Sequence, residues 1–153
     1  MSVLVRSQLK KTRIDSAEAS RFARFIMGRL RCARGAELSV LFAGSGAVRR
    51  LNREYRGVDR TTDVLAFPLS SRRAEALRAG ALGDVVISVD RARRCARRLR
   101  TTANAEILLY LTHGILHLCG FDDRTARGRV RMERRQEALI RQALKRRSWN
   151  VIS

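Results

Sequence analysis

The sequence is poor in acidic residues and in lysine, and it has one proline and two histidines. Its 153 residues carry 33 basic but only 14 acidic side chains, so the formal net charge is +19. Three basic residues, Lys10, Lys11 and Lys145, are lysines and the others are arginines. Codon bias can enrich arginine, but it does not remove aspartate and glutamate. A field this positive favours a polyanionic partner, and we expect nucleic acid. A ribosome-bound or membrane-surface protein is the alternative.

Long apolar runs and paired cysteines are also lacking. No segment approaches the ~20 apolar residues of a membrane span, and the opening stretch MSVLVRSQLKK lacks the apolar part of a signal peptide. The three cysteines, Cys32, Cys95 and Cys119, show no CxxC spacing. We therefore expect reduced thiols, a cytoplasmic location and no membrane association. A chain of this length suits one core, so residues 1–153 are expected to form a single domain.

Hydrophobic periodicity predicts strands and helices that alternate early in the chain, with helices dominating later. Strands are predicted at 2–7, 36–44, 62–69 and 82–90. Helices are predicted at 15–35, 45–57, 90–100, 103–120 and 124–147, the first two ending at Gly35 and Gly57. The polar segment 70–81 is expected to be a loop. These elements predict an α/β (α+β) domain, with one mixed sheet of about four strands and about five helices in two or three layers.

Both histidines of the chain lie in one short stretch, HGILHLCGFDD at 113–123. Residues four apart share a helix face, so His113 and His117 can present two imidazoles to one metal ion. Gly120 can end the helix, and the chain can then bring the carboxylate of Asp123 back as a third ligand. Three protein ligands leave a fourth position for water, which is typical of a catalytic zinc site.

Other interpretations stay open on spacing alone. Two histidines on an apolar helix are commonly hydrogen-bonded core residues. Asp122, Asp123 or Thr125 can each cap the last helix. Cys119 can be a further ligand, although a small buried side chain is the commoner interpretation.

Three stretches together resemble one known family. HGILHLCGFDD resembles the HGxLHLxGYDH signature of the YbeY family. LNREYRGVDRTTDVLAFP resembles its LNxxYRxxDxPTDVLSFP stretch, and LGDVVIS resembles its LGDIxIS strand. The three occur in the family's order at comparable spacing, and the resemblance covers roughly residues 37 to 140.

The resemblance implies a single-domain, metal-dependent bacterial endoribonuclease. Such an enzyme matures ribosomal RNA, especially the 3′ end of the small-subunit RNA, and acts in ribosome quality control. The implied partners are RNA and the small ribosomal subunit, and the implied cofactor is one zinc ion held by three histidines. His113 and His117 match the first two ligands. Arg56 matches the arginine of the family's cleft, where it would contact a phosphate and act in catalysis with His113. Taken alone, Arg56 is more commonly interpreted as a solvated residue at a helix end.

The third ligand departs from the family pattern, because Asp123 replaces the final histidine. Thr61 and Ala66 are smaller departures, where the family usually has proline and serine. A carboxylate keeps a ligand but lowers the charge of the metal centre by one, makes its bound water less acidic and favours harder metals. We expect zinc or another divalent metal here, with catalysis retained, slowed or lost.

Further residues are candidates for supporting roles. Asp63, Asp84 and Asp122 could orient a ligand or contact substrate, although acids at turns and strand ends are common without such a role. The arginine clusters RARRCARRLR and ARGRVRMERR are expected to bind RNA phosphates, or else form solvated faces. The RNA-binding candidates are Arg93, Arg94, Arg97, Arg98, Arg127, Arg131 and Arg134.

Two rival functions remain. A zinc metallopeptidase also uses an HxxxH pair, but it places glutamate directly after the first histidine, where this chain has Gly114. The second rival is a non-catalytic RNA- or ribosome-binding relative that has lost its metal. Metal content separates this rival from the enzyme.

Overall fold

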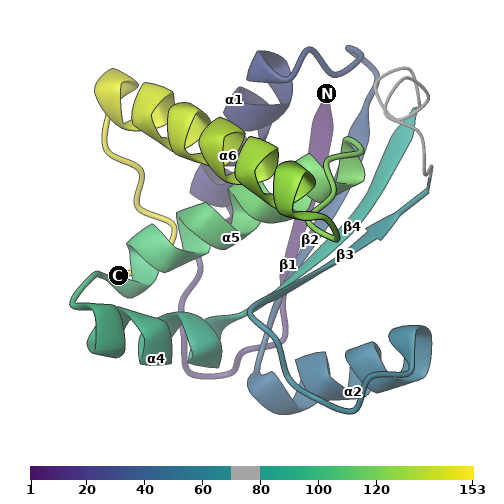
Figure 1. The fold of residues 1–153 in the computed structure, drawn as a ribbon. Helices are drawn as coiled ribbons and strands as arrows, with labels where there is room; N and C mark the ends of the chain where they lie inside the picture. The colour runs from purple at the N-terminus through teal and green to yellow at the C-terminus, as the bar shows by residue number, and fades with distance from the viewer. Residues whose placement is uncertain (70–79) are drawn as a thin grey trace.

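The computed structural model describes residues 1–69 and 80–153, so most of the expected loop at 70–81 falls outside the described residues (Figure 1). The strands are β1 Ser2–Ser7, β2 Glu37–Ala43, β3 Val64–Pro68 and β4 Ala81–Ser88. The helices are α1 Ser16–Arg29, α2 Ser45–Arg56, α4 Val89–Leu99, α5 Ala103–Leu118 and α6 Ala126–Arg146. These elements confirm the predicted mixed four-stranded sheet and, within the described residues, the five predicted helices.

The sheet has the strand order β1-β2-β4-β3. β1, β2 and β4 run parallel, and β3 pairs antiparallel with β4 at one edge. Pro68, which lacks an amide proton, is the last residue of this edge strand, where a missing donor costs least. The edge position of β3 leaves one side of that strand open for the functional site described below.

Helices cover the two faces of the sheet unequally. α1 and α5 pack on one face, and α6 packs across both of them, as Figure 1 shows. The larger hydrophobic core lies here and contains Phe22, Ile26 and Ile115. α2 covers the opposite face over a smaller cluster that includes Val48 and Leu65. Because α5 is buried nearly all round, it sits at the centre of the molecule, as its composition predicts.

The predicted end of α1 at Gly35 is wrong. The helix ends at Arg29, and Arg31 takes a left-handed backbone conformation with φ 60°. The amide of Cys32 then donates to the carbonyl of Met27, which closes the helix. Leu30 and Cys32 are both buried, so the helix ends early because these side chains turn into the core. Tertiary packing therefore overrides the glycine signal.

The C-terminal tail folds back onto α1. Ile152 forms an isolated β-bridge with Ile14, and the Trp149 ring lies edge-on to Phe22 at 5.4 Å. Arg147 donates to the buried carboxylate of Glu18 at 2.7 and 3.1 Å. These contacts anchor the C-terminal tail to α1 and to the segment that precedes it.

Replacing Glu18 with glutamine is expected to lower the free energy of unfolding at pH 7 by about 1–3 kcal/mol, because a buried charge-assisted bond is lost. The hydrogen bond from Arg147 lowers the pKa of Glu18 below its ordinary 4.5. The stabilisation is therefore complete above about that value and is lost as pH falls through the lower pKa of the folded state. Urea unfolding between pH 7 and pH 3 measures both effects. A variant with wild-type stability at pH 7 would contradict this role.

Among the described helices, none combines the length and apolar character that crossing a membrane requires.

Candidate metal centre

Helix α5, which packs on β3 and β4, carries both histidines. Thr102 caps its start by accepting the amide of Ala105, as a side-chain N-cap should. At Gly114 the helix lies so close to β4 that an added Cβ would meet Val85 at 2.7 Å. His113 and His117 flank this contact point one turn apart and line the same groove. The two imidazole rings are 4.8 Å apart, and each side chain is about 30% exposed.

The turn after α5 brings Asp123 back to the histidines. Gly120 has φ +91°, which a side chain would strain, and the chain reverses there as the sequence predicts. Thr125 caps α6 by accepting the amide of Gly128, so Asp123 is not needed as the cap. Its Oδ2 lies 3.9 Å from Nε2 of His113 and 3.7 Å from Nε2 of His117.

The three side chains fit a metal ion. One ligand atom from each lies within 4.8 Å of the other two. Tetrahedral ligands at about 2.1 Å from zinc would be about 3.4 Å apart. The two distances from Asp123 exceed this by a few tenths of an ångström, and the limit of 4.8 Å for the group leaves up to about 1.4 Å for side-chain rotation to close. His113, His117 and Asp123 can therefore hold a metal ion. Cys119 does not join them, since its sulfur packs 3.8 Å from that of Cys32 in the core.

The protonation of the histidines suits metal binding. Nδ1 of His113 lies 2.9 Å from Oε1 of Gln136. In the tautomer that carries its proton on Nδ1, the ring donates to this oxygen and Nε2 keeps its lone pair. Burial and the neighbouring His113 lower the pKa of His117 below its ordinary value. The lowered pKa favours a neutral His117, whose ring nitrogen then has a lone pair available to a cation.

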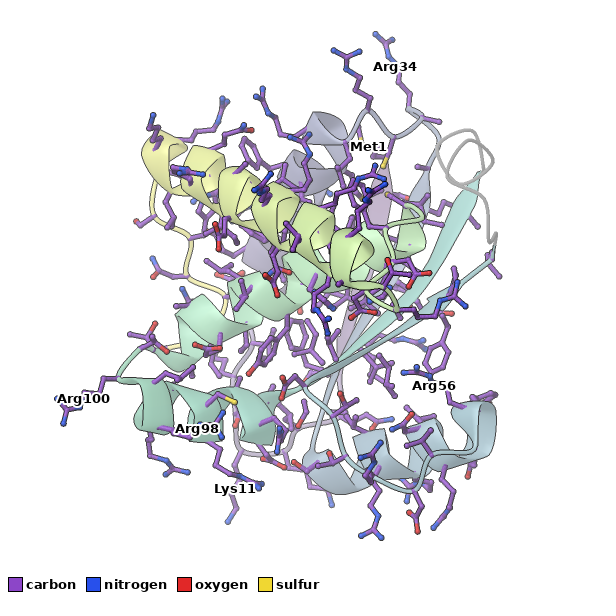
Figure 2. All side chains as sticks on the ribbon, in the orientation of Figure 1. Met1, Lys11, Arg34, Arg56, Arg98 and Arg100 are labelled. Carbon is purple, nitrogen blue, oxygen red and sulfur yellow. The ribbon has the colours of Figure 1, made fainter. Side chains whose placement is uncertain are left out.

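An open groove of about 420 Å³ lies in front of the three ligands. The groove is lined by Arg56 at the end of α2, by residues of β3 and α5, and by Asp63 and Gln136. Figure 2 shows Arg56 between the end of α2 and β3. The structure thus brings Arg56, predicted as the phosphate contact, to the same groove as the histidine pair.

The three candidate acids lie in different places. Asp63 lines the groove, but its carboxylate accepts a bond from Nε of Arg91 at 3.0 Å. Asp122 accepts from the amide and Nε of Arg124, which lowers the pKa of Asp122. Asp84 is exposed and lines a separate hollow beside β1 and β2. The structure therefore places Asp63 near the ligands and Asp84 away from them.

The two arginine clusters do not form one surface. All seven predicted RNA-binding arginines are exposed. Arg127 and Arg131 line a hollow of about 260 Å³ with Gly120 and Asp122, next to the ligand loop. The predicted RNA-binding arginines of α4 line neither the groove nor this hollow, and in Figure 2 Arg98 lies on the opposite side of the molecule to Arg56. The cluster on α6 is thus the nearer of the two to the candidate centre.

Sequence reasoning missed Gln136 in the groove and the pairing of Arg91 with a groove residue. Gln136 lies on the buried stripe of α6 formed by Met132, Leu139 and Ala143. One polar residue in an apolar stripe was a usable signal, but the dense arginines of this segment obscured it. Arg91 was grouped with the expected phosphate contacts of α4, whereas it pairs with Asp63.

Comparison with known proteins supports the resemblance seen in the motifs. The family model described as Endoribonuclease YbeY matches residues 5–144. A protein named Endoribonuclease YbeY from an Anaeromyxobacter species is 47% identical over 69% of this chain and 54% of its own length. The protein of the same name from Anaeromyxobacter dehalogenans is 45% identical over 86% of this chain and 71% of its own length. The chain thus spans about half to three quarters of the length of these relatives.

A solved structure shares the fold. The solution structure of TM1509 from Thermotoga maritima matches with a TM-score of 0.61 and 22% identity, over 94% of this chain and 93% of that one. The family model covers most of the chain and the curated relatives agree with it, so the chain belongs to the YbeY family.

Proposed function

We propose that this protein is a metal-dependent endoribonuclease that cleaves single-stranded RNA. The main observation behind the proposal is that His113, His117, Asp123 and Arg56 all line one open groove. The names of its relatives support the reaction class. The preserved ligand geometry favours an enzyme over a non-catalytic relative, and Gly114 in place of a general-base glutamate argues against a peptidase.

His113, His117 and Asp123 would hold one divalent ion, with zinc as the first candidate and a harder metal as the second. When bound, the ion supplies a Lewis acid that activates water or polarises a phosphate oxygen. Gln136 keeps the proton of His113 on Nδ1 and thereby aims Nε2 into the groove. Arg56 grips a phosphate through its planar guanidinium and holds the strand across the ligands.

Ribosomal RNA is the substrate that the family resemblance supports. We propose maturation of the small-subunit RNA at its 3′ end, together with ribosome quality control, in the cytoplasm. The net charge of +19 and the thiol state of the cysteines support this assignment.

Cleavage of a labelled single-stranded RNA and of its duplex tests the proposed reaction. Internal cuts in the single strand are expected with zinc or manganese and not with a chelator, and the duplex should be largely spared. Metal-loaded protein that binds RNA without cutting it would favour the non-catalytic relative.

RNA affinity is expected to fall steeply with salt, with a log–log slope of several units, because several phosphates are neutralised. Replacing Arg127, Arg131 and Arg134 by glutamine should flatten that slope by about one unit for each phosphate that is no longer neutralised. A matched triple variant at Arg93, Arg94 and Arg97 measures the contribution of α4. Fluorescence anisotropy between about 50 and 300 mM salt gives both values. An unchanged slope in both variants would mean that the clusters are merely solvated.

A further inference from the structure

Tyr55 is an exposed aromatic side chain at the border of the groove. Its exposed fraction is 70%. The other aromatic side chains among the described residues are buried or half-buried. The sequence has only eight residues of the types Phe, Trp and Tyr. None of the eight falls in residues 70–79, the segment outside the described range. Tyr55 directly precedes Arg56 within the LNREYR stretch, and neither the metal centre nor the core accounts for it.

The Tyr55 ring is held in place by a second aromatic residue. Its centroid lies 5.7 Å from that of Phe67 in an edge-to-face contact with planes at 64°. Phe67 is half-buried and packs on the cluster under α2. One side of the tyrosine is thus supported, while most of its surface remains open to a partner.

Each member of this aromatic pair is the chain neighbour of a groove residue. Tyr55 adjoins Arg56 on α2, and Phe67 adjoins Ala66 on β3. Successive side chains of a strand point to opposite faces, so Ala66 faces the groove and Phe67 faces α2. Because β3 is an edge strand, only the width of that strand separates the groove from the aromatic pair.

We propose that the Tyr55–Phe67 pair is a stacking platform for an unpaired nucleobase of the RNA strand whose phosphate Arg56 holds. This inference rests on the proposed function and deepens it. An exposed aromatic face beside a cationic groove is the arrangement that single-stranded nucleic acid uses, since every base offers a π face. The neighbouring cation Arg56, which lines the groove, complements the backbone of the same strand. A base in a duplex is already stacked on both sides, so this platform selects unpaired RNA.

The test uses the full chain in chelator, where RNA is bound and not cut, with a short single-stranded RNA and a series of the same RNA carrying one abasic nucleotide. Tyr55→Phe should bind intact RNA within twofold of wild type. Tyr55→Leu, which keeps apolar area but has no π face, should bind it at least fivefold more weakly. The abasic nucleotide should weaken binding to the wild type at one position of the RNA. At that same position it should not weaken the binding of Tyr55→Leu any further. Leu144→Ala, at another exposed apolar side chain, is the matched control and should change nothing.

Two failures are distinguishable. If Tyr55→Leu binds intact RNA like wild type, or if every abasic RNA affects both proteins equally, the platform is refuted while cleavage by the wild type still supports the proposed function. If the wild type neither binds nor cuts single-stranded RNA, the proposed function itself fails. Tyr55 is mostly exposed, so each variant should unfold at the wild-type temperature, and a shift of more than a few degrees would assign Tyr55 a structural role instead.

Discussion

Asp123→Ala is expected to lose bound metal and RNA cleavage together. The carboxylate lies 3.7 and 3.9 Å from the two imidazole nitrogens and is the proposed third ligand. Loss of groups that merely support a ligand already weakens metal binding by about 10–100-fold, so loss of the ligand should cost at least as much. Elemental analysis and the cleavage rate on one RNA, measured on the same preparation, check both outcomes.

Two further variants sharpen this result. Asp123→His restores the ligand set of the family, so it should retain metal and keep or raise the cleavage rate. Asp122→Asn changes the neighbouring acid, whose carboxylate is bound by Arg124, and should leave the metal content unchanged. If Asp123→Ala keeps its full metal content and full rate, the histidine pair has a different third partner.

Arg56→Ala is expected to slow cleavage of single-stranded RNA at least tenfold, about 1.4 kcal/mol of transition-state stabilisation. The metal content should not change, because Arg56 lines the groove without belonging to the ligand group. Arg56→Lys should recover only part of the rate, since an ammonium cannot make the planar two-pronged contact. Single-turnover rates on one RNA measure these differences.

Arg53→Ala is the matched control for Arg56. Arg53 lies one turn earlier on α2, and its guanidinium is 4.0 Å from the carboxylate of Asp59. Its loss should change the rate by less than twofold, about 0.4 kcal/mol. An Arg56→Ala variant as active as this control would remove Arg56 from the proposed catalytic machinery.

Much of the fold and of the candidate centre follows from local sequence patterns. The alternating strands and the apolar helix are set by hydrophobic periodicity, and both are found. The meeting of His113, His117 and Asp123 follows from helix geometry and the turn at Gly120. These features depend on neighbours within about ten residues of one another.

Features that depend on distant partners could not be predicted in this way. The early end of α1 is set by the burial of Leu30, which a local glycine signal does not report. Gln136 reaches His113 across 23 residues, and Arg91 reaches Asp63 across 28. In a chain so rich in arginine, composition alone cannot tell an arginine that pairs with an internal acid from one that meets phosphate.

The metal content of untagged protein, purified without added metal, tests the central claim most directly. We predict about one divalent ion per chain in the wild type, most simply zinc, and near none in Asp123→Ala. Elemental analysis of both proteins, after dialysis against metal-free buffer, gives the ratio without any assay of activity. A wild-type ratio near zero that added zinc or manganese does not raise would contradict the account and leave an RNA-binding protein without a metal centre.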